Sequence, residues 1–206
     1  MARKAKIAIK TKETDIKIEL TIDGRGVNVI TTPNPFFSHM LSNFSKHGLF
    51  DLKLSAKGDV DVDYHHTIED VGLRLGSAFK KALGSASGIR RCAGASMPMM
   101  DSLATVTVDV SNRPYFRFNT TKESDGLNKK SVFSDRKARV FDMGLLKEFL
   151  KAFSNAAGVD LHVSILYGDD IHHAIEAVFK SLGRALSSAV EKDARIKGAL
   201  STKGRL

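Results

Sequence analysis

The chain has 206 residues and a hydrophobic content of 42%, which is enough for one domain or for two small fused halves. Its single cysteine, Cys92, excludes an intramolecular disulfide framework and suits a reducing cytoplasm. No stretch resembles a secretory signal or a membrane span, so we expect a cytoplasmic protein without a membrane partner. The net charge of +9 favours an anionic partner. Because basic and aromatic residues do not interleave, a phosphorylated small molecule is favoured over nucleic acid.

Apolar residues at every second position predict strands, and apolar residues three or four apart predict helices. The first half predicts a hairpin over residues 6–23 with its turn at 11–14, a strand at 27–30, a helix over about 36–47, strand structure over 49–63 and a helix from 65 to about 84. The second half predicts a connector over 88–100, strands at 103–110 and 115–118, an exposed, mobile loop over 119–130, a helix over about 142–155, a strand at 159–165, a second long helix and a basic tail to 206. The order helix, strand, helix therefore occurs in both halves.

Two short stretches are copies of one another. The first motif is His65-His66-Thr67-Ile68-Glu69, and the second motif is His172-His173-Ala174-Ile175-Glu176. Each begins a predicted helix, where residues three and four apart are neighbours, so both imidazoles lie near the glutamate. Nitrogen and oxygen donors together suit Mn, Fe, Co, Ni or Zn better than Mg or Ca. The duplication favours a metal site over two ordinary solvated helix starts.

The earlier helix of each half also repeats. A shift of 109 residues places His39 opposite Glu148. This alignment rests on three matched pairs, which are Leu41 with Leu150, Phe44 with Phe153 and Ser45 with Ser154. Each half therefore offers a further candidate ligand from its first helix.

The chain resembles the imidazoleglycerol-phosphate dehydratase family of histidine-biosynthesis enzymes over nearly its whole length. Besides the two motifs, the matching segments are 11–14, 36–41, 89–91, 111–115 and 201–204. The resemblance implies an α+β fold of two similar fused halves, each a four-stranded sheet backed by two helices, similar to a ribosomal-protein domain. It implies one dehydratase domain over residues 1–206, made of two repeats at about 1–90 and 91–206. It also implies a homo-oligomer of 24 subunits with active sites between subunits.

The resemblance further implies two Mn²⁺ ions per active site. The implied metal ligands are His39, His65, His66, Glu69, Glu148, His172, His173 and Glu176. The residues implied to contact the substrate are Glu13, His39, His47, His65, Glu69, Arg91, Arg113, His172, Lys180, Ser201, Thr202 and Lys203. Arg91, Arg113 and Lys203 would hold the phosphate, because guanidinium forks suit a dianion.

The implied reaction is the metal-dependent dehydration of D-erythro-imidazole glycerol phosphate to imidazole acetol phosphate. The proton that leaves carbon in this reaction is not acidic, so its direct removal would be slow. A metal that acts as Lewis acid and template would favour the reaction. We expect Glu69 or Glu176 to act as the acid or base, and Glu13 to position the substrate hydroxyls.

The sequence departs from the family pattern at three places. Ser38 stands where the family usually has aspartate, residues 32–35 replace a Thr-Gly-Ile segment, and residues 99–103 replace Met-Asp-Glu-Ala-Leu. These changes bear on metal affinity and on rate, because residues behind metal ligands tune both. His162 matches a family histidine for which we expect a structural role.

Three other interpretations fit parts of the sequence. A nucleic-acid-binding module would show salt-sensitive RNA binding, but it gives no reason for the paired motifs. A metal-binding shell protein without activity would hold metal and show no turnover. A di-iron helical bundle uses Glu-x-x-His on four long helices, against which the predicted strands argue.

Overall fold

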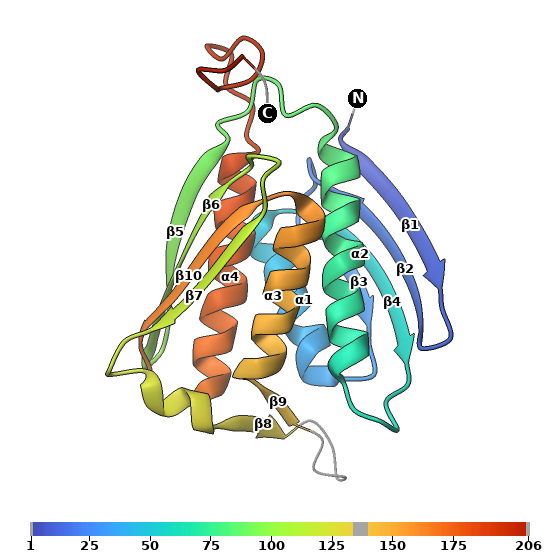
Figure 1. Cartoon of the computed structure of the whole chain (residues 1–206), viewed down its shortest axis with the longest axis vertical. Coiled ribbons are helices and arrows are strands. Elements are labelled where there is room, and N and C mark those ends of the chain that lie inside the picture. The colour runs from blue at the N-terminus through green and yellow to red at the C-terminus, as the bar shows by residue number, and fades with distance from the viewer. Residues whose placement is uncertain (1, 134–139, 205–206) are drawn as a thin grey trace.

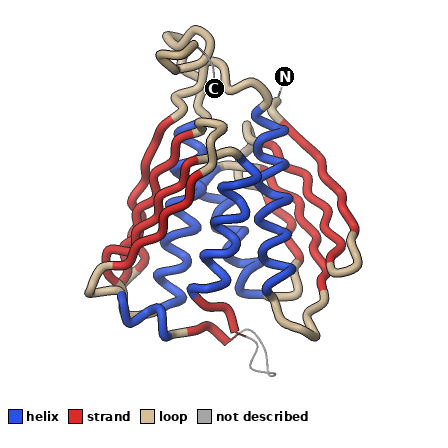
Figure 2. Tube along the Cα trace, in the orientation of Figure 1, coloured by secondary structure: helices blue, strands red, loops and turns tan. Residues whose placement is uncertain are grey.

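The computed structural model describes residues 2–133 and 140–204, so the last two residues of the basic tail lie outside the described residues. Within this part of the chain, two four-stranded sheets enclose a layer of helices (Figure 1). Figure 2 shows the two large sheets on the outer sides and the helices between them. The expected α+β architecture of two similar fused halves is confirmed. No helix among the described residues has the length and apolar character that a membrane crossing requires.

The first sheet has the strand order β1-β2-β4-β3. Its strands are β1 (Lys4–Lys10), β2 (Thr14–Thr21), β3 (Asn28–Thr31) and β4 (Asp51–Gly58). β3 and β4 are parallel and are joined by α1 (Pro35–Gly48), whereas the other pairs are antiparallel. Alternate side chains such as Ile16, Ile18 and Leu20 are buried beneath α2 (His65–Leu83).

The second sheet has the equivalent order β5-β6-β10-β7. Its strands are β5 (Cys92–Met99), β6 (Ser102–Asp109), β7 (Tyr115–Thr120) and β10 (Asp160–Tyr167). The parallel pair is β7 with β10, which follows α3 (Met143–Ala157), and α4 (Ile171–Ala189) packs against β5 and β6. A 3-10 helix (Asp125–Lys129) and the short hairpin β8 (Ser131–Phe133) and β9 (Val140–Asp142) precede α3.

Three predicted segments were wrong. The connector over 88–100 contains β5, which was missed because its inward residues are small, such as Ala93 and Ala95, where α4 packs closely. β5 also contains Pro98, which is tolerated because β5 is a sheet edge. Strand structure ends at Gly58 instead of reaching residue 63. The predicted loop over 119–130 holds the 3-10 helix, whose Leu127 is buried.

The helices of one half pack against those of the other half: α1 lies against α4, and α2 against α3. Equivalent glycines permit both contacts. A Cβ on Gly76 of α2 would lie 2.6 Å from the carbonyl oxygen of Phe153, and one on Gly183 of α4 would lie 2.4 Å from that of Phe44. The predicted alignment of α1 with α3 holds in detail, because Ser45 Oγ and Ser154 Oγ each donate to the carbonyl oxygen five residues on, at 2.7 and 2.6 Å.

Candidate metal and substrate site

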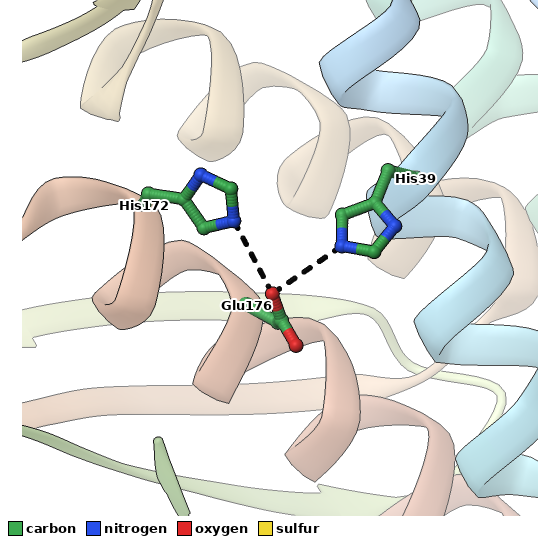
Figure 3. Close-up of side chains that lie close together, drawn as sticks. All are labelled: His39, His172 and Glu176. Atoms are coloured by element: carbon green, nitrogen blue, oxygen red, sulfur yellow. Dashed lines mark hydrogen bonds and ion pairs between the residues drawn. The ribbon is translucent and has the colours of Figure 1, made fainter. Parts of the chain in front are cut away.

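The N-terminal turn of α4 and the N-terminal half of α1 bring three side chains together. His39 Nε2 lies 3.4 Å from Glu176 Oε2, and His172 Nε2 lies 3.3 Å from the same oxygen (Figure 3). Their ligand atoms all fall within 4.8 Å of one another. Asp170 fixes the start of α4, because its carboxylate accepts from the backbone N–H of His172 at 2.7 Å. Two imidazoles and a carboxylate in this arrangement can hold a divalent cation.

Glu176 is the one carboxylate among the buried polar side chains of the described residues, with 6% of its surface exposed. Its Oε1 lies 2.6 Å from Lys180 Nζ, which also contacts the sulfur of Met99 at 3.2 Å. Burial raises the pKa of Glu176. The hydrogen bond and charge of Lys180, together with His39, lower this pKa by more than burial raises it, so it lies below its ordinary value. Glu176 is therefore an anion that faces three cationic or ligating groups.

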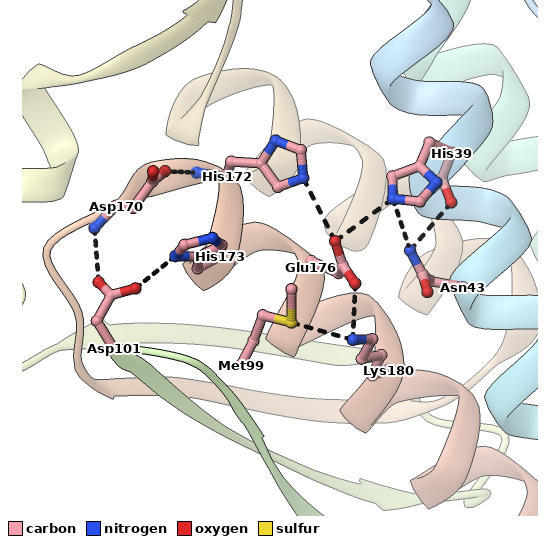
Figure 4. Close-up of polar contacts among 9 residues, drawn as sticks. All are labelled: His39, Asn43, Met99, Asp101, Asp170, His172, His173, Glu176 and Lys180. Atoms are coloured by element: carbon pink, nitrogen blue, oxygen red, sulfur yellow. Dashed lines mark hydrogen bonds and ion pairs between the residues drawn. The ribbon is translucent and has the colours of Figure 1, made fainter.

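His173 points away from this group and meets Asp101 at the β5–β6 turn (Figure 4). Its Nδ1 is hydrogen-bonded to Asp101 Oδ1. Asp101 Oδ2 accepts from the backbone N–H groups of Asp169 and Asp170 at 2.6 and 2.8 Å. The backbone N–H of Asp170, that of Asp169 and the His173 ring hold the pKa of Asp101 far below its ordinary value.

The first motif lies at the start of α2 and is not part of the three-residue group. His65 Nε2 is 3.6 Å from Glu69 Oε2, and His66 Nδ1 is 2.9 Å from Asp59 Oδ2. The Asp59 hydrogen bond is the main reason that the pKa of His66 is raised, and nearby Glu13 adds to it. The described residues contain one group of three candidate ligands, so the structure does not bring the two motifs together in one chain.

Glu148 lies half-buried on α3, which packs against α2, the helix of the first motif. It is not part of the three-residue group among the described residues. Its place on α3 corresponds to that of His39 on α1, which packs against the helix of the second motif. The helix pairing therefore puts each fourth candidate ligand on the helix beside the motif of the other half.

Glu13 lies in the β1–β2 turn, which the side chain of Thr11 shapes. Thr11 Oγ1 accepts from the backbone N–H groups of Glu13 and Thr14 at 3.1 and 2.9 Å. Thr14 Oγ1 in turn donates to Asp70 Oδ2 of α2 at 2.5 Å. These bonds anchor the turn that carries Glu13 to the helix that carries the first motif.

A basic cavity of about 1020 Å³ lies at the opposite end of the helices. Its lining includes Arg91, Arg113, Ser201, Thr202 and Lys203, as well as Arg195 and Lys197, and no acidic residue. Arg91 Nε and Nη2 are held by Asp109 at 2.6 and 2.7 Å, and Nη1 donates to the carbonyl oxygen of Leu200 at 2.8 Å. The cluster of cationic side chains suits a phosphate, although Arg91 already forms hydrogen bonds with Asp109 and Leu200.

His47, Ser38 and His162 were also singled out in the sequence, and none of them belongs to the three-residue group. Burial lowers the pKa of His47, and the charges of Lys180 and Arg184 lower it further. Ser38 Oγ accepts a hydrogen bond from the backbone N–H of Thr32 at 3.0 Å and so stabilises the connection between β3 and α1. His162 lies on the exposed face of β10, 3.0 Å from Asp160, and is not part of the three-residue group.

Sequence reasoning gave no role to Asp59 or Asp101, each of which contacts a histidine of a motif. Asp59 precedes the first motif in a turn, and Asp101 lies 72 residues before His173. Neither position has a spacing that relates it to its histidine, although Asp101 lies in the 99–103 segment whose departure from the family pattern bears on metal affinity.

Comparisons with known proteins point to one family. Residues 32–186 match the family model described as imidazoleglycerol-phosphate dehydratase. The imidazoleglycerol-phosphate dehydratase of Citrifermentans bemidjiense is 49% identical over 206 residues, which is 100% of each chain. That of Bacillus licheniformis is 48% identical over 204 residues, 99% of this chain and 100% of the relative.

Two solved structures show the same fold. The enzyme from Pyrococcus furiosus superimposes with a TM-score of 0.76 at 32% identity, and covers 97% of this chain and 100% of its own. The enzyme from Staphylococcus aureus gives a TM-score of 0.73 at 30% identity over 94% of this chain and 100% of its own. The chain therefore belongs to the imidazoleglycerol-phosphate dehydratase family, whose members are lyases of histidine biosynthesis.

Proposed function

We propose that this chain dehydrates D-erythro-imidazole glycerol phosphate to imidazole acetol phosphate with two Mn²⁺ ions per active site. The convergence of His39 and His172 on Glu176 carries the proposal. Neutral imidazole and carboxylate donors suit Mn²⁺, and the buried anion of Glu176 offers a charge that a cation would compensate. The eight ligands proposed are those named from the sequence, with His39, His172 and Glu176 already within reach of one ion.

The two ends of the molecule support a site that forms between copies of the chain. His172 lies in the first turn of α4, whereas the backbone N–H of Arg91 donates to the carbonyl oxygen of Ala189 at the other end of that helix. Over its 19 residues, α4 spans about 28 Å. Because a small substrate cannot bridge that length, the metal end of one copy would meet the basic cavity of another. A 24-subunit shell, as the family resemblance implies, would provide such contacts.

Each chain residue then has a role. Bound Mn²⁺ would supply Lewis acidity and a template for the imidazole ring. The carboxylate of Glu176 or Glu69 would move the proton at the reacting carbon, and the lowered pKa keeps Glu176 ionised and ready to accept it. Glu13, held by the Thr11 turn, would orient the hydroxyl groups.

The remaining proposed contacts lie on both sides of the site. His47 and Lys180 would meet the substrate beside Glu176, since the charge of Lys180 reaches both. Arg113 and the Ser201–Lys203 segment would bind the phosphate in the basic cavity. Arg91 would join them through its remaining N–H groups.

Two broader assignments belong to the same proposal. Residues 1–206 would form one dehydratase domain of two repeats, about 1–90 and 91–206. A cytoplasmic location would suit a biosynthetic enzyme with one cysteine.

An activity assay tests the proposal. Purified protein is incubated with imidazole glycerol phosphate, with added Mn²⁺ or with a chelator, and product formation is followed. We expect turnover that the chelator abolishes and that added Mn²⁺ restores. Folded, Mn²⁺-loaded protein without turnover would instead identify a metal-binding relative that has lost its chemistry.

A further inference from the structure

We propose that Asp59 and Asp101 are positioning residues that orient the rings of His66 and His173, so that Nε2 of each histidine is the atom offered to the metal. The inference rests on the proposed function and extends it to two residues outside the motifs. Its basis is the geometry of the two hydrogen bonds, which have the same atoms at both sites.

The two histidines of each motif have different partners. His65 and His172 turn Nε2 toward the glutamate of their own helix, at 3.6 and 3.3 Å. His66 and His173 instead turn Nδ1 toward an aspartate from outside the helix. The second histidine of each motif is therefore held from behind, and Figure 4 shows this for His173 and Asp101.

The acceptors fix the tautomer. An ionised carboxylate can only accept a hydrogen bond, so Nδ1 of each ring carries the proton. The lone pair of a neutral imidazole is then on Nε2, the nitrogen that a metal requires. Carboxylate–histidine–metal arrangements of this kind set ring orientation and ligand basicity.

The two aspartates come from parts of the fold that the repeat does not relate. Asp59 lies in the β4–α2 turn, whereas Asp101 lies in the β5–β6 turn. The counterpart of the β5–β6 turn in the first half is the β1–β2 turn, which carries Glu13. The same hydrogen bond therefore arises in two independent ways, which an incidental surface contact does not explain.

The backbone around Asp101 holds the carboxylate in place. Two backbone N–H groups of the loop before α4 bind its Oδ2, which leaves Oδ1 for His173. An asparagine at this position keeps one oxygen for these N–H groups but presents an NH₂ group to the ring. The ring must then rotate or move its proton to Nε2, and either change removes the metal-binding lone pair from its place.

The test compares Asp101→Asn and Asp59→Asn with the wild type and with Asp160→Asn. Asp160 is a matched control because it also pairs with a histidine, His162, at 3.0 Å but on the exposed face of β10. Free Mn²⁺ is measured by electron paramagnetic resonance during titration of chelator-treated full-length protein. We expect Asp101→Asn and Asp59→Asn to weaken Mn²⁺ binding roughly 10- to 100-fold, and Asp160→Asn to leave it unchanged.

Thermal unfolding of the chelator-treated proteins separates positioning from folding. Equal melting of Asp101→Asn and the wild type, with weaker Mn²⁺ binding, supports the proposal. If Asp101→Asn fails to fold, Asp59→Asn decides, because the Asp59 carboxylate bonds to His66 and is not needed to hold a loop backbone. If the folded Asp101→Asn and Asp59→Asn variants bind Mn²⁺ with wild-type affinity, the positioning role is overturned while the proposed metal site stands. A wild type that binds no Mn²⁺ overturns the metal assignment, and this inference with it.

Discussion

Burial and neighbouring charges have opposite effects on Glu176. The side chain is 6% exposed, which favours the neutral acid, yet Lys180 and His39 favour the anion and lower the net pKa. A carboxylate in such a place is costly unless cations surround it. Its burial beside two imidazoles is therefore the strongest single indication, at the residue scale, that a cation belongs here.

Glu176→Gln tests that assignment. The amide keeps the shape but removes the charge that binds the cation and accepts the proton. We expect turnover to fall by a factor on the order of 10² or more, with weaker Mn²⁺ binding. Steady-state kinetics and a Mn²⁺ titration measure the two effects. Glu19→Gln is the control, since Glu19 pairs with Lys6 on the exposed face of the first sheet; normal turnover in Glu176→Gln would remove the proton-transfer role.

Asp51 gives a pH-dependent contribution to stability. The backbone N–H groups of Arg25 and Val27 donate to its carboxylate at 2.9 and 3.0 Å and lower its pKa from the ordinary value of 3.8. Near and below that pH the unfolded chain binds more protons than the folded one. The stabilisation is therefore complete above pH 3.8 and is lost as the pH falls further.

We therefore expect the difference in unfolding free energy between the wild type and Asp51→Asn to be constant at neutral pH. It should shrink as the pH falls below 3.8. Urea unfolding of chelator-treated protein at a series of pH values measures it. A difference that grows toward acid pH would contradict the assignment.

At the scale of the elements, close helix contacts rest on glycine. On Gly76 a Cβ would lie 2.9 Å from the backbone nitrogen of Ala157, besides its contact with Phe153. On Gly183 a Cβ would lie 2.9 Å from the backbone nitrogen of Gly48. Both contacts are with backbone of the facing helix, which cannot move aside as a flexible side chain can. The glycines thus set the distance between α2 and α3 and between α4 and α1.

Gly76→Ala and Gly183→Ala should each force their helices apart. We expect a loss of about 1–3 kcal/mol of unfolding free energy, as for other overpacked contacts. Gly126→Ala is the matched control, because a Cβ there meets nothing within 4 Å. Urea midpoints at one protein concentration compare the three variants. Equal midpoints for all three would show that the helix pairs tolerate wider spacing.

Most elements could be predicted because periodicity and repetition are local signals. The hairpin over 6–23 and the helix from 65 follow from alternation and from apolar spacing. β5 could not be found this way, since close packing by α4 selects small side chains such as Ala93 and so removes the apolar signal. β4 ends at Gly58 because that residue pairs with Thr14, where the neighbouring strand β2 begins, so the following residues have no partner in β2.

The site could be predicted only in part. The motifs are visible in the sequence, but the pairing of α1 with α4 brings His39 of the first half to Glu176 of the second half, which the repeat did not assign. The aspartates behind His66 and His173 depend on how turns fold, since Asp59 lies in the turn before α2 and Asp101 lies in the β5–β6 turn, 72 residues before His173. The separation of the metal end from the basic cavity is likewise a property of the folded molecule, because Arg91 and the Ser201–Lys203 segment line one cavity only after folding.

For the molecule as a whole, an active site shared between copies predicts complementation. His172→Ala removes a metal ligand and Arg113→Ala removes a phosphate contact, so each variant alone should be inactive. When the two are unfolded together, mixed in equal amounts and reassembled, sites that combine an intact metal end with an intact basic cavity should form. For two-chain sites, about a quarter should be intact, and activity should return to that level.

The same variants mixed without unfolding give the control, since subunits that do not exchange cannot complement. Recovery is measured as turnover per total chain after reassembly. If reassembled mixtures stay inactive while the reassembled wild type regains its turnover, each site is built from a single chain, and the argument from the length of α4 fails.

The exchange of helix partners between the two halves has a consequence for the origin of the chain. α1 and α2 find their partners in α4 and α3, so a half-length polypeptide would leave its helix layer uncovered. Two identical half-length polypeptides would cover each other through the same two contacts. A gene that encoded one motif would thus have produced an obligate homodimer. Joining two copies of such a gene would turn a symmetric subunit interface into the interior of one protein, and would leave positions such as His39 and Glu148 free to diverge.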